Sequence, residues 1–300
     1  MTQQQRQALD ELLRHGPLDV GGDVAEQRKI FHEMIASVPL PEDVSAEPGE
    51  LGGVPVVTVR TTSFDLDPTT AVLYFHGGAY ALGSAPDSVG LAADVSRRAG
   101  AKVISVDYRL APEHPFPAAV DDAVAAYRAL LESGVPGSSV AFVGESAGGG
   151  LVACTLVALK EAGLPQPASA AVFSPWVDLS VSGASATDKA ALDPALTPEA
   201  LRIRARDYLG DRDPATTPLA SPIFADLSGL PPLLIQVGSH EILLDDAVRL
   251  AARAGHHDVP VELQIWPAVP HVFQGFAALL DDADQALNAA AAFLRRNWAR

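Results

Sequence analysis

The sequence has very little cysteine and comparatively little positive charge. Its 300 residues include one cysteine, Cys154, so no internal disulfide framework can form. Cys154 lies in an apolar segment, where we expect a buried structural thiol. Lysine and arginine total 21 against 37 aspartates and glutamates, a formal net charge of −16. Nucleic acids and anionic membrane surfaces would be approached against like charge, so we expect neither as a partner.

Long apolar runs and targeting signals are also missing. Nowhere do about 18 uncharged apolar residues follow one another, as a membrane-spanning helix requires. The first residues, 1–6, carry no apolar segment behind a basic start. We find no internal repeat and no low-complexity tract. With 48% hydrophobic residues, the chain can bury one large core, and we expect a cytoplasmic protein built on one main domain.

Apolar strand-like runs alternate with helical patterns along most of the chain. Strands are predicted at 54–61, 71–75, 102–106, 140–143, 170–173, 233–237 and 261–266. Helices are predicted at 88–99, 118–131, 151–160 and 281–298. A further helix is predicted after residues 238–241, and we expect it to end near residue 254 because Gly255 follows. Residues 39–48 are predicted to form a loop. This alternation predicts an α/β fold with a doubly wound, mostly parallel sheet.

Two parts of the chain depart from that alternation. Residues 1–45 contain two amphipathic helical patterns before the first predicted strand. Their apolar positions are Leu9, Leu12 and Leu13 in the first and Phe31, Met34, Ile35 and Val38 in the second. Residues 181–230 hold one clear helix, 198–209, among proline- and aspartate-rich loops. We interpret 181–230 as a cap inserted into a catalytic domain spanning 46–300; the N-terminal helices either join this cap or only pack against the domain.

A short apolar strand leads into a glycine-flanked serine and then a helix. The segment Gly144-Glu145-Ser146-Ala147-Gly148 matches the G-x-S-x-G nucleophile elbow. Only residues with small side chains can flank a serine at so sharp a turn. The elbow would lift the Ser146 hydroxyl above the sheet and place the Ala147 amide at a helix N-terminus, where it can stabilise negative charge.

A second glycine turn follows the predicted strand 71–75. It reads His76-Gly77-Gly78-Ala79-Tyr80, and it can present backbone N–H groups without intervening side chains. Taken alone, it could be an ordinary turn beside a structural histidine. Together with the elbow, it predicts the rest of an oxyanion-binding site.

A serine nucleophile requires a histidine base, which in turn requires a carboxylate to orient it. His240 and His271 follow predicted strands downstream of Ser146, and His271 alone has a strand-end acid before it. The adjacent His256 and His257 lack the spacing of metal ligands, so we expect no metal and no cofactor.

These motifs together resemble the bacterial hormone-sensitive lipase family of α/β-hydrolase carboxylesterases. The resemblance runs over about residues 70–275 and is carried by His76-Gly77-Gly78, 107–117, the elbow, Ser174-Pro175-Trp176 and His271-Val272-Phe273. Within the family, the monoterpene ε-lactone hydrolases and related esterases look most similar. The resemblance implies Ser146 as nucleophile, His271 as base, the amides of Gly77, Gly78 and Ala147 as oxyanion hole, and a cap that includes the N-terminal helices.

The resemblance also suggests an acid and a pocket. Aligned with the family pattern D-P-L-x-D-E, residues 241–246 place Glu241 at the acid position, where aspartate is usual; Asp245 is the alternative acid. The implied cap makes a set of aromatic and aliphatic side chains candidates for substrate binding: Tyr80, Phe31, Met34, Leu201 and Tyr208.

The expected function is therefore a serine carboxylic-ester hydrolase that acts on short-chain or small cyclic esters through an acyl-enzyme. A lactone hydrolase and a non-catalytic ligand receptor on the same fold are the alternatives. The expected partner is a small neutral ester or lactone, and a homodimer remains an open alternative to a monomer.

Overall fold

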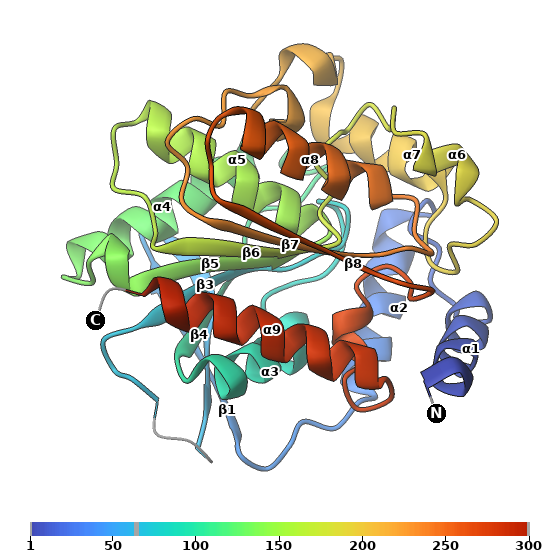
Figure 1. Ribbon diagram of the computed structural model, residues 1–300, viewed down its shortest axis with the longest axis horizontal. Helices are drawn as coiled ribbons and strands as arrows, with labels where there is room; N and C mark the ends of the chain where they lie inside the picture. Colours follow the sequence, from blue (N-terminus) through green and yellow to red (C-terminus); the bar gives the residue numbers. More distant parts are fainter. Residues whose placement is uncertain (1, 63–65, 299–300) are drawn as a thin grey trace.

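The computed structural model describes residues 2–62 and 66–298, which form a sheet of eight strands covered by helices on both faces (Figure 1). The strands are β1 (Val44–Leu51), β2 (Val54–Thr61), β3 (Ala71–Phe75), β4 (Lys102–Val106), β5 (Val140–Glu145), β6 (Ser169–Phe173), β7 (Leu233–Gly238) and β8 (Val261–Trp266). Their order is β1-β2-β4-β3-β5-β6-β7-β8. The strands from β4 to β8 in this order pair in parallel, whereas β2 is antiparallel to both its neighbours. The predicted mostly parallel α/β fold is confirmed.

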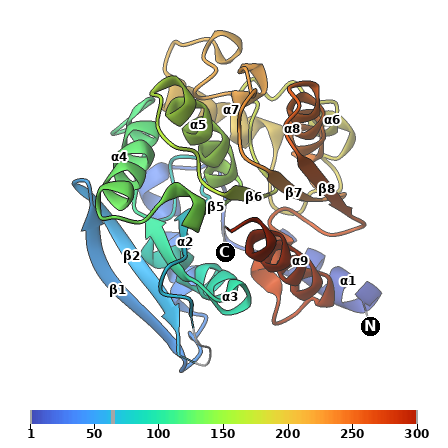
Figure 2. The same ribbon diagram turned by 60° about the vertical axis from the view of Figure 1, so that its left-hand side comes forward.

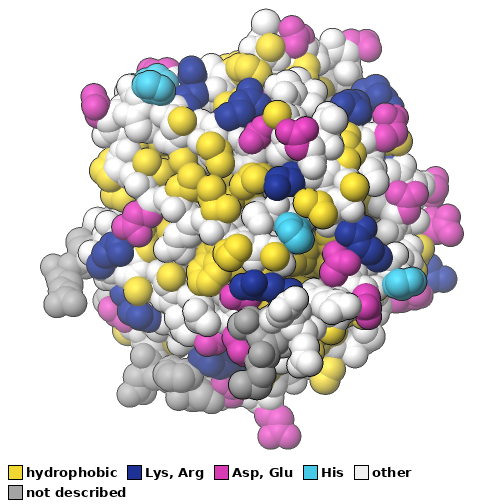
Figure 3. All heavy atoms as spheres, turned by 45° about the vertical axis from the view of Figure 1, so that its right-hand side comes forward, with side chains coloured by type: hydrophobic (Ala, Val, Ile, Leu, Met, Phe, Trp, Pro, Cys, Tyr) yellow, Lys and Arg dark blue, Asp and Glu magenta, His cyan; other side chains and the backbone are white. Residues whose placement is uncertain are grey.

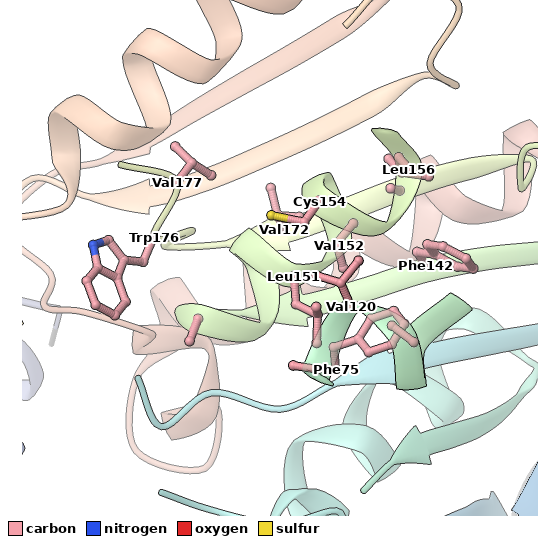
Figure 4. Packing of buried hydrophobic residues seen from close by; sticks show 14 of the residues in the cluster. Phe75, Val120, Phe142, Leu151, Val152, Cys154, Leu156, Val172, Trp176 and Val177 are labelled. Carbon is pink, nitrogen blue, oxygen red and sulfur yellow. The ribbon is translucent and has the colours of Figure 1, made fainter. Parts of the chain in front are cut away.

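Helices pack on the two faces of the sheet. One face carries α4 (Ala118–Glu132), α5 (Ala147–Glu161) and α8 (Leu244–His256), and the other carries α3 (Val89–Ala99) and α9 (Asp281–Asn297) (Figures 1 and 2). Helix α5 is buried on nearly all sides and packs on the central strands, and Figure 4 shows its Cys154 among these apolar side chains. Cys154 is a free, buried thiol, as predicted.

Strand β1 is absent from the predicted elements, which treated 39–48 as a loop. It is an edge strand whose residues are mostly exposed, so its sequence shows no alternation of apolar and polar residues. It pairs with β2 through the turn at Gly52 and Gly53, both of which have positive φ (Figure 2). Pairing with β2, rather than its own composition, makes this segment a strand.

Two predicted helix ends differ from the structure by more than one residue. Helix α5 begins at Ala147, directly after the elbow, instead of at residue 151. Helix α8 runs through Gly255 to His256, and the positive φ that marks its exit belongs to Asp258. Glycine in a last turn therefore did not end this helix.

The N-terminal helices lie beside the inserted segment, although the two are far apart in sequence. Helices α1 (Thr2–Arg14) and α2 (Val24–Ala36) occupy the same end of the sheet as α6 (Ser185–Asp188) and α7 (Pro198–Leu209) (Figure 1). The buried guanidinium of Arg204 donates to the carbonyl oxygen of Gly22 at 2.9 Å. Arg28 donates to the carbonyl oxygens of Ala81 and Ala111 at 2.8 and 2.9 Å. These contacts tie both segments to each other and to the core; the domain limits remain a prediction.

Part of the predicted apolar face of these helices is exposed. Leu9 is buried, but Leu12, Ile35 and Val38 are 56%, 38% and 66% exposed. On the face seen in Figure 3, hydrophobic side chains gather in patches among charged side chains of both signs. Across residues 2–62 and 66–298, no helix combines the length and apolar character needed to cross a membrane.

Candidate active site

The backbone at Ser146 has the geometry of a nucleophile elbow. Ser146 follows β5, begins the turn into α5 and has φ 55° and ψ −123°, a region that residues with side chains rarely adopt. A Cβ atom on Gly148 would lie 2.0 Å from the carbonyl oxygen of Phe75, and one on Gly144 would lie 2.4 Å from that of Gly148. The flanking glycines are therefore required by close backbone contacts.

Three side chains from three separate loops meet at the elbow. His271 Nε2 lies 2.9 Å from Ser146 Oγ, and His271 Nδ1 lies 2.8 Å from Glu241 Oε2. Glu241 is fully buried, and Ser146 and His271 are 8% and 9% exposed. The arrangement lets the imidazole accept the serine proton on one nitrogen while a carboxylate orients the other.

The alternative acid, Asp245, lies elsewhere. Its carboxylate accepts a hydrogen bond from the amide of Ser185 at 3.0 Å. The next residue, Asp246, is buried and accepts from the amides of Val177 and Asp178. Of the carboxylates considered from the sequence, Glu241 is thus the one that contacts His271.

The Glu241 carboxylate is held by more than the imidazole. Its Oε1 atom accepts hydrogen bonds from the Gly238 amide at 2.6 Å and from Ser174 Oγ at 2.8 Å. Ser174 Oγ also accepts from the amide of Val272 at 3.0 Å, beside His271. Ser174 was noted in the sequence only as part of a motif, and its position at the end of β6 was the available signal for a role at the site.

The structure corrects the predicted oxyanion donors at Gly77. The Gly77 amide donates to Glu145 Oε1 at 2.7 Å, so it is not free for a substrate oxygen. The other oxygen of this carboxyl accepts from the Tyr74 hydroxyl. Sequence inspection missed Glu145 because its partners come from another strand and turn. The amides of Gly78 and Ala147 remain as candidate donors.

The two buried ionisable groups at the elbow have altered acidities. Burial raises the pKa of Glu145 to about 7, although the Tyr74 and Gly77 hydrogen bonds oppose this change. Burial acts to lower the pKa of His271, but the hydrogen bond and charge of Glu241, with the charges of Asp193 and Glu145, outweigh it and raise that pKa. The site therefore favours the imidazolium that forms when the serine loses its proton.

The predicted substrate-binding residues fall into two groups. Tyr80, Leu201 and Tyr208 are at most 1% exposed, and the rings of Tyr80 and Tyr208 stack with centroids 4.0 Å apart. They join α7 to the core and do not line an open surface. Phe31 and Met34 are half-buried on α2. Substrate contact by any of the five remains a prediction.

The other histidines named in the sequence analysis, His76, His240, His256 and His257, make no described hydrogen bond to Ser146. His76 is buried, bonds the Gly77 carbonyl oxygen through Nδ1 and stacks on Tyr108. His257 bonds the Arg253 carbonyl oxygen. Within the described part of the chain, no three His, Cys, Asp or Glu side chains are grouped so as to hold a metal ion.

Comparison with known proteins identifies the family of this chain. A family model described as alpha/beta hydrolase fold matches residues 72–275. The chain is 49% identical over 224 residues to an acetyl-hydrolase of Streptomyces hygroscopicus, covering 75% of each chain, and 35% identical to an esterase of Acinetobacter venetianus, covering 87% and 85%.

Solved structures extend the similarity to nearly the whole chain. A crystal structure of an esterase from the bacterial hormone-sensitive lipase family superposes with a TM-score of 0.94 at 40% identity, covering 99% of both chains. The esterase EstE5, in a crystal soaked with p-nitrophenyl butyrate, superposes with a TM-score of 0.93 at 38% identity over 99% of both chains. This chain therefore belongs to the α/β-hydrolase family, within the bacterial hormone-sensitive lipase esterases, and is a hydrolase of the esterase class.

Proposed function

We propose that this protein is a serine carboxylesterase that cleaves esters of short acyl groups through an acyl-enzyme on Ser146. The single observation that carries the proposal is the unbroken chain of hydrogen bonds from Ser146 Oγ through His271 to Glu241. Ser146 also has a strained backbone, and strain of this kind is concentrated at functional sites. Strain and the buried hydrogen bonds together support a nucleophilic role for this serine.

The reaction follows from these positions. His271 Nε2 takes the proton of Ser146 Oγ as the oxygen attacks the ester carbonyl carbon. The tetrahedral intermediate collapses, the C–O bond to the alcohol breaks, and His271 returns the proton to the departing alkoxide. Water then attacks the acyl-enzyme with the same base, which releases the acid and restores Ser146. Glu241 holds the imidazole in the required tautomer and stabilises its charged form.

Backbone amides would bind the oxygen that becomes negative. Because Glu145 occupies the Gly77 amide, we assign this role to the amides of Gly78, Ala79 and Ala147. Gly78 and Ala79 have positive φ values of 111° and 53°, and successive amides in such a turn converge on an anion. Ala147 is the first residue of α5, where the helix dipole also favours negative charge.

The proposed substrate is a small neutral ester, and acetyl and butyryl esters are its first candidates. This choice rests on the name of the Streptomyces hygroscopicus relative, an acetyl-hydrolase, and on the low exposure of Ser146, which is 8%. A small lactone would fit the same chemistry. A ligand receptor without catalysis is disfavoured because His271 contacts both Ser146 and Glu241.

Activity should be highest on short acyl chains. With p-nitrophenyl esters of increasing chain length, we expect kcat/KM to peak at acetate or butyrate and to fall at octanoate and palmitate, because a covered serine limits the space for an acyl chain. No jump in rate is expected at a lipid–water interface. Faster hydrolysis of a long-chain triglyceride emulsion than of a soluble short ester would contradict this prediction.

The dependence of rate on pH should report His271. The imidazole must be neutral to accept the serine proton, and its pKa is raised above 6.5. We therefore expect kcat/KM to fall as the pH decreases through a value above 6.5, which a profile on p-nitrophenyl butyrate would measure. A rate that stayed constant well below pH 6.5 would argue against His271 as the base.

A further inference from the structure

The residue after Glu241 is held on both sides by the inserted segment. The Ile242 amide donates to Asp193 Oδ2 at 2.8 Å, and the Ile242 carbonyl oxygen accepts from Ser185 Oγ at 2.6 Å. Ser185 Oγ also accepts from the Asp245 amide at 3.0 Å. Both backbone polar groups next to Glu241 are therefore satisfied by residues of the 181–230 segment.

Asp193 is a buried carboxylate with all of its described partners on backbone amides. It is 5% exposed, and its Oδ1 accepts from Ala195 at 2.8 Å and from Leu196 at 2.9 Å. These two bonds fix the turn that carries Asp193, while Oδ2 reaches Ile242. The bonds to Ala195 and Leu196 are sufficient to shape the turn, so the bond to the Ile242 amide indicates a second role for Asp193.

The turn that carries Asp193 is also held by the N-terminal helix α1. Arg14 of α1 donates to the carbonyl oxygens of Ala191 and Leu192 at 3.3 and 2.9 Å. Arg14 is itself oriented by Asp10 at 2.7 Å. A continuous set of polar contacts thus runs from α1 through residues 191–193 to Ile242 and Glu241.

We propose that Asp193 is a positioning residue that holds the Glu241 loop in its productive place, so that the triad is complete only when the 181–230 segment is seated. The inference rests on the proposed function, because it assigns Asp193 a role in orienting the base of that reaction. Displacing the segment would free the Ile242 amide and loosen the carboxylate that orients the imidazole. Small displacements of an oriented group cost about 10²-fold in rate.

The charge of Asp193 gives the proposal a distinctive signature. The groups that act on His271 are Glu241 from the loop after β7, Asp193 from the insertion and Glu145 from the end of β5. Asp193 raises the pKa of His271, as do the other two. Removing its charge should therefore lower that pKa and shift the acidic limb of the rate profile toward lower pH. If Asp193 only supported the loop and had no electrostatic effect on His271, the acidic limb of the rate profile would stay at the same pH.

The test compares Asp193→Asn with Ser185→Ala on p-nitrophenyl butyrate. For Asp193→Asn we expect kcat to fall roughly 10- to 100-fold with a smaller change in KM, and the acidic limb to move to lower pH. Ser185→Ala removes the other bond to Ile242 without a change of charge, so kcat should fall while the limb stays in place. Glu145 is present in both variants, so its own titration affects them equally.

A charge control and a nucleophile control complete the design. Asp226→Asn removes a carboxylate that pairs with Lys160 at the far end of α5, and it should leave both kcat and the limb unchanged. Wild-type kcat and profile in Asp193→Asn, or a fall in kcat without a shift of the limb, would overturn the proposal. If Asp193→Asn does not fold, undiminished kcat in Ser185→Ala would overturn the coupling. Ser146→Ala in the same assay distinguishes a failure of the Asp193 proposal from a failure of the proposed function. If Ser146→Ala kept its activity, the proposed function itself would be overturned.

Discussion

Replacing Ser146 with alanine is expected to remove nearly all esterase activity while leaving the fold intact. Alanine keeps the Cβ atom and removes only the hydroxyl, whose described partner is His271 Nε2 at 2.9 Å. Loss of a triad member commonly costs about 10³-fold or more in kcat, with a residual rate from the oxyanion hole. Initial rates on p-nitrophenyl butyrate, with circular dichroism to check folding, would measure the effect.

His271→Ala should cause a loss of similar size, because the nucleophile and base act as one unit. Combining the two substitutions should then cost little more than either alone. If either variant kept more than about a tenth of the wild-type rate, a loss below roughly 1.4 kcal/mol of transition-state stabilisation, the assignment would be wrong.

Glu241→Gln should reduce kcat by about three to four orders of magnitude. Glutamine has nearly the same shape, but it removes the charge that stabilises the imidazolium and can present an N–H group to His271 Nδ1, which favours the wrong tautomer. The full burial of Glu241 makes the loss larger, since no water can replace the carboxylate. Steady-state kinetics on a short ester, with the melting temperature measured in parallel, would test this.

Asp245→Asn is the matched control for Glu241→Gln, because it is equally isosteric and lies four positions along the same segment. Asp245 binds the Ser185 amide and does not reach His271, so we expect its substitution to cost less than about tenfold in kcat. A crippled Asp245→Asn beside a nearly normal Glu241→Gln would reverse the assignment of the acid.

Local patterns in the sequence were sufficient for the parts of the site that depend on neighbouring residues. The elbow is recognisable within Gly144–Gly148, because the strain at Ser146 and the contact of Gly144 with Gly148 arise in the turn itself, although the space at Gly148 is limited by the carbonyl oxygen of Phe75 on the adjacent strand β3. The parallel strands were predicted because burial on both faces leaves continuous apolar runs. Placing Glu241 opposite His271 needed only the order of strands and a family pattern.

Only the tertiary structure decided which residues far apart in sequence form hydrogen bonds or pair as strands. The Gly77 amide meets Glu145, which lies 68 positions away in sequence, and this contact removed Gly77 from the predicted oxyanion donors. Strand β1 exists because β2 offers it a free edge, although its own residues favour a loop. Asp193 meets Ile242 across 49 positions. Composition and periodicity report which face of an element is buried, but a hydrogen bond between distant loops depends on backbone positions set by the packing of the whole chain.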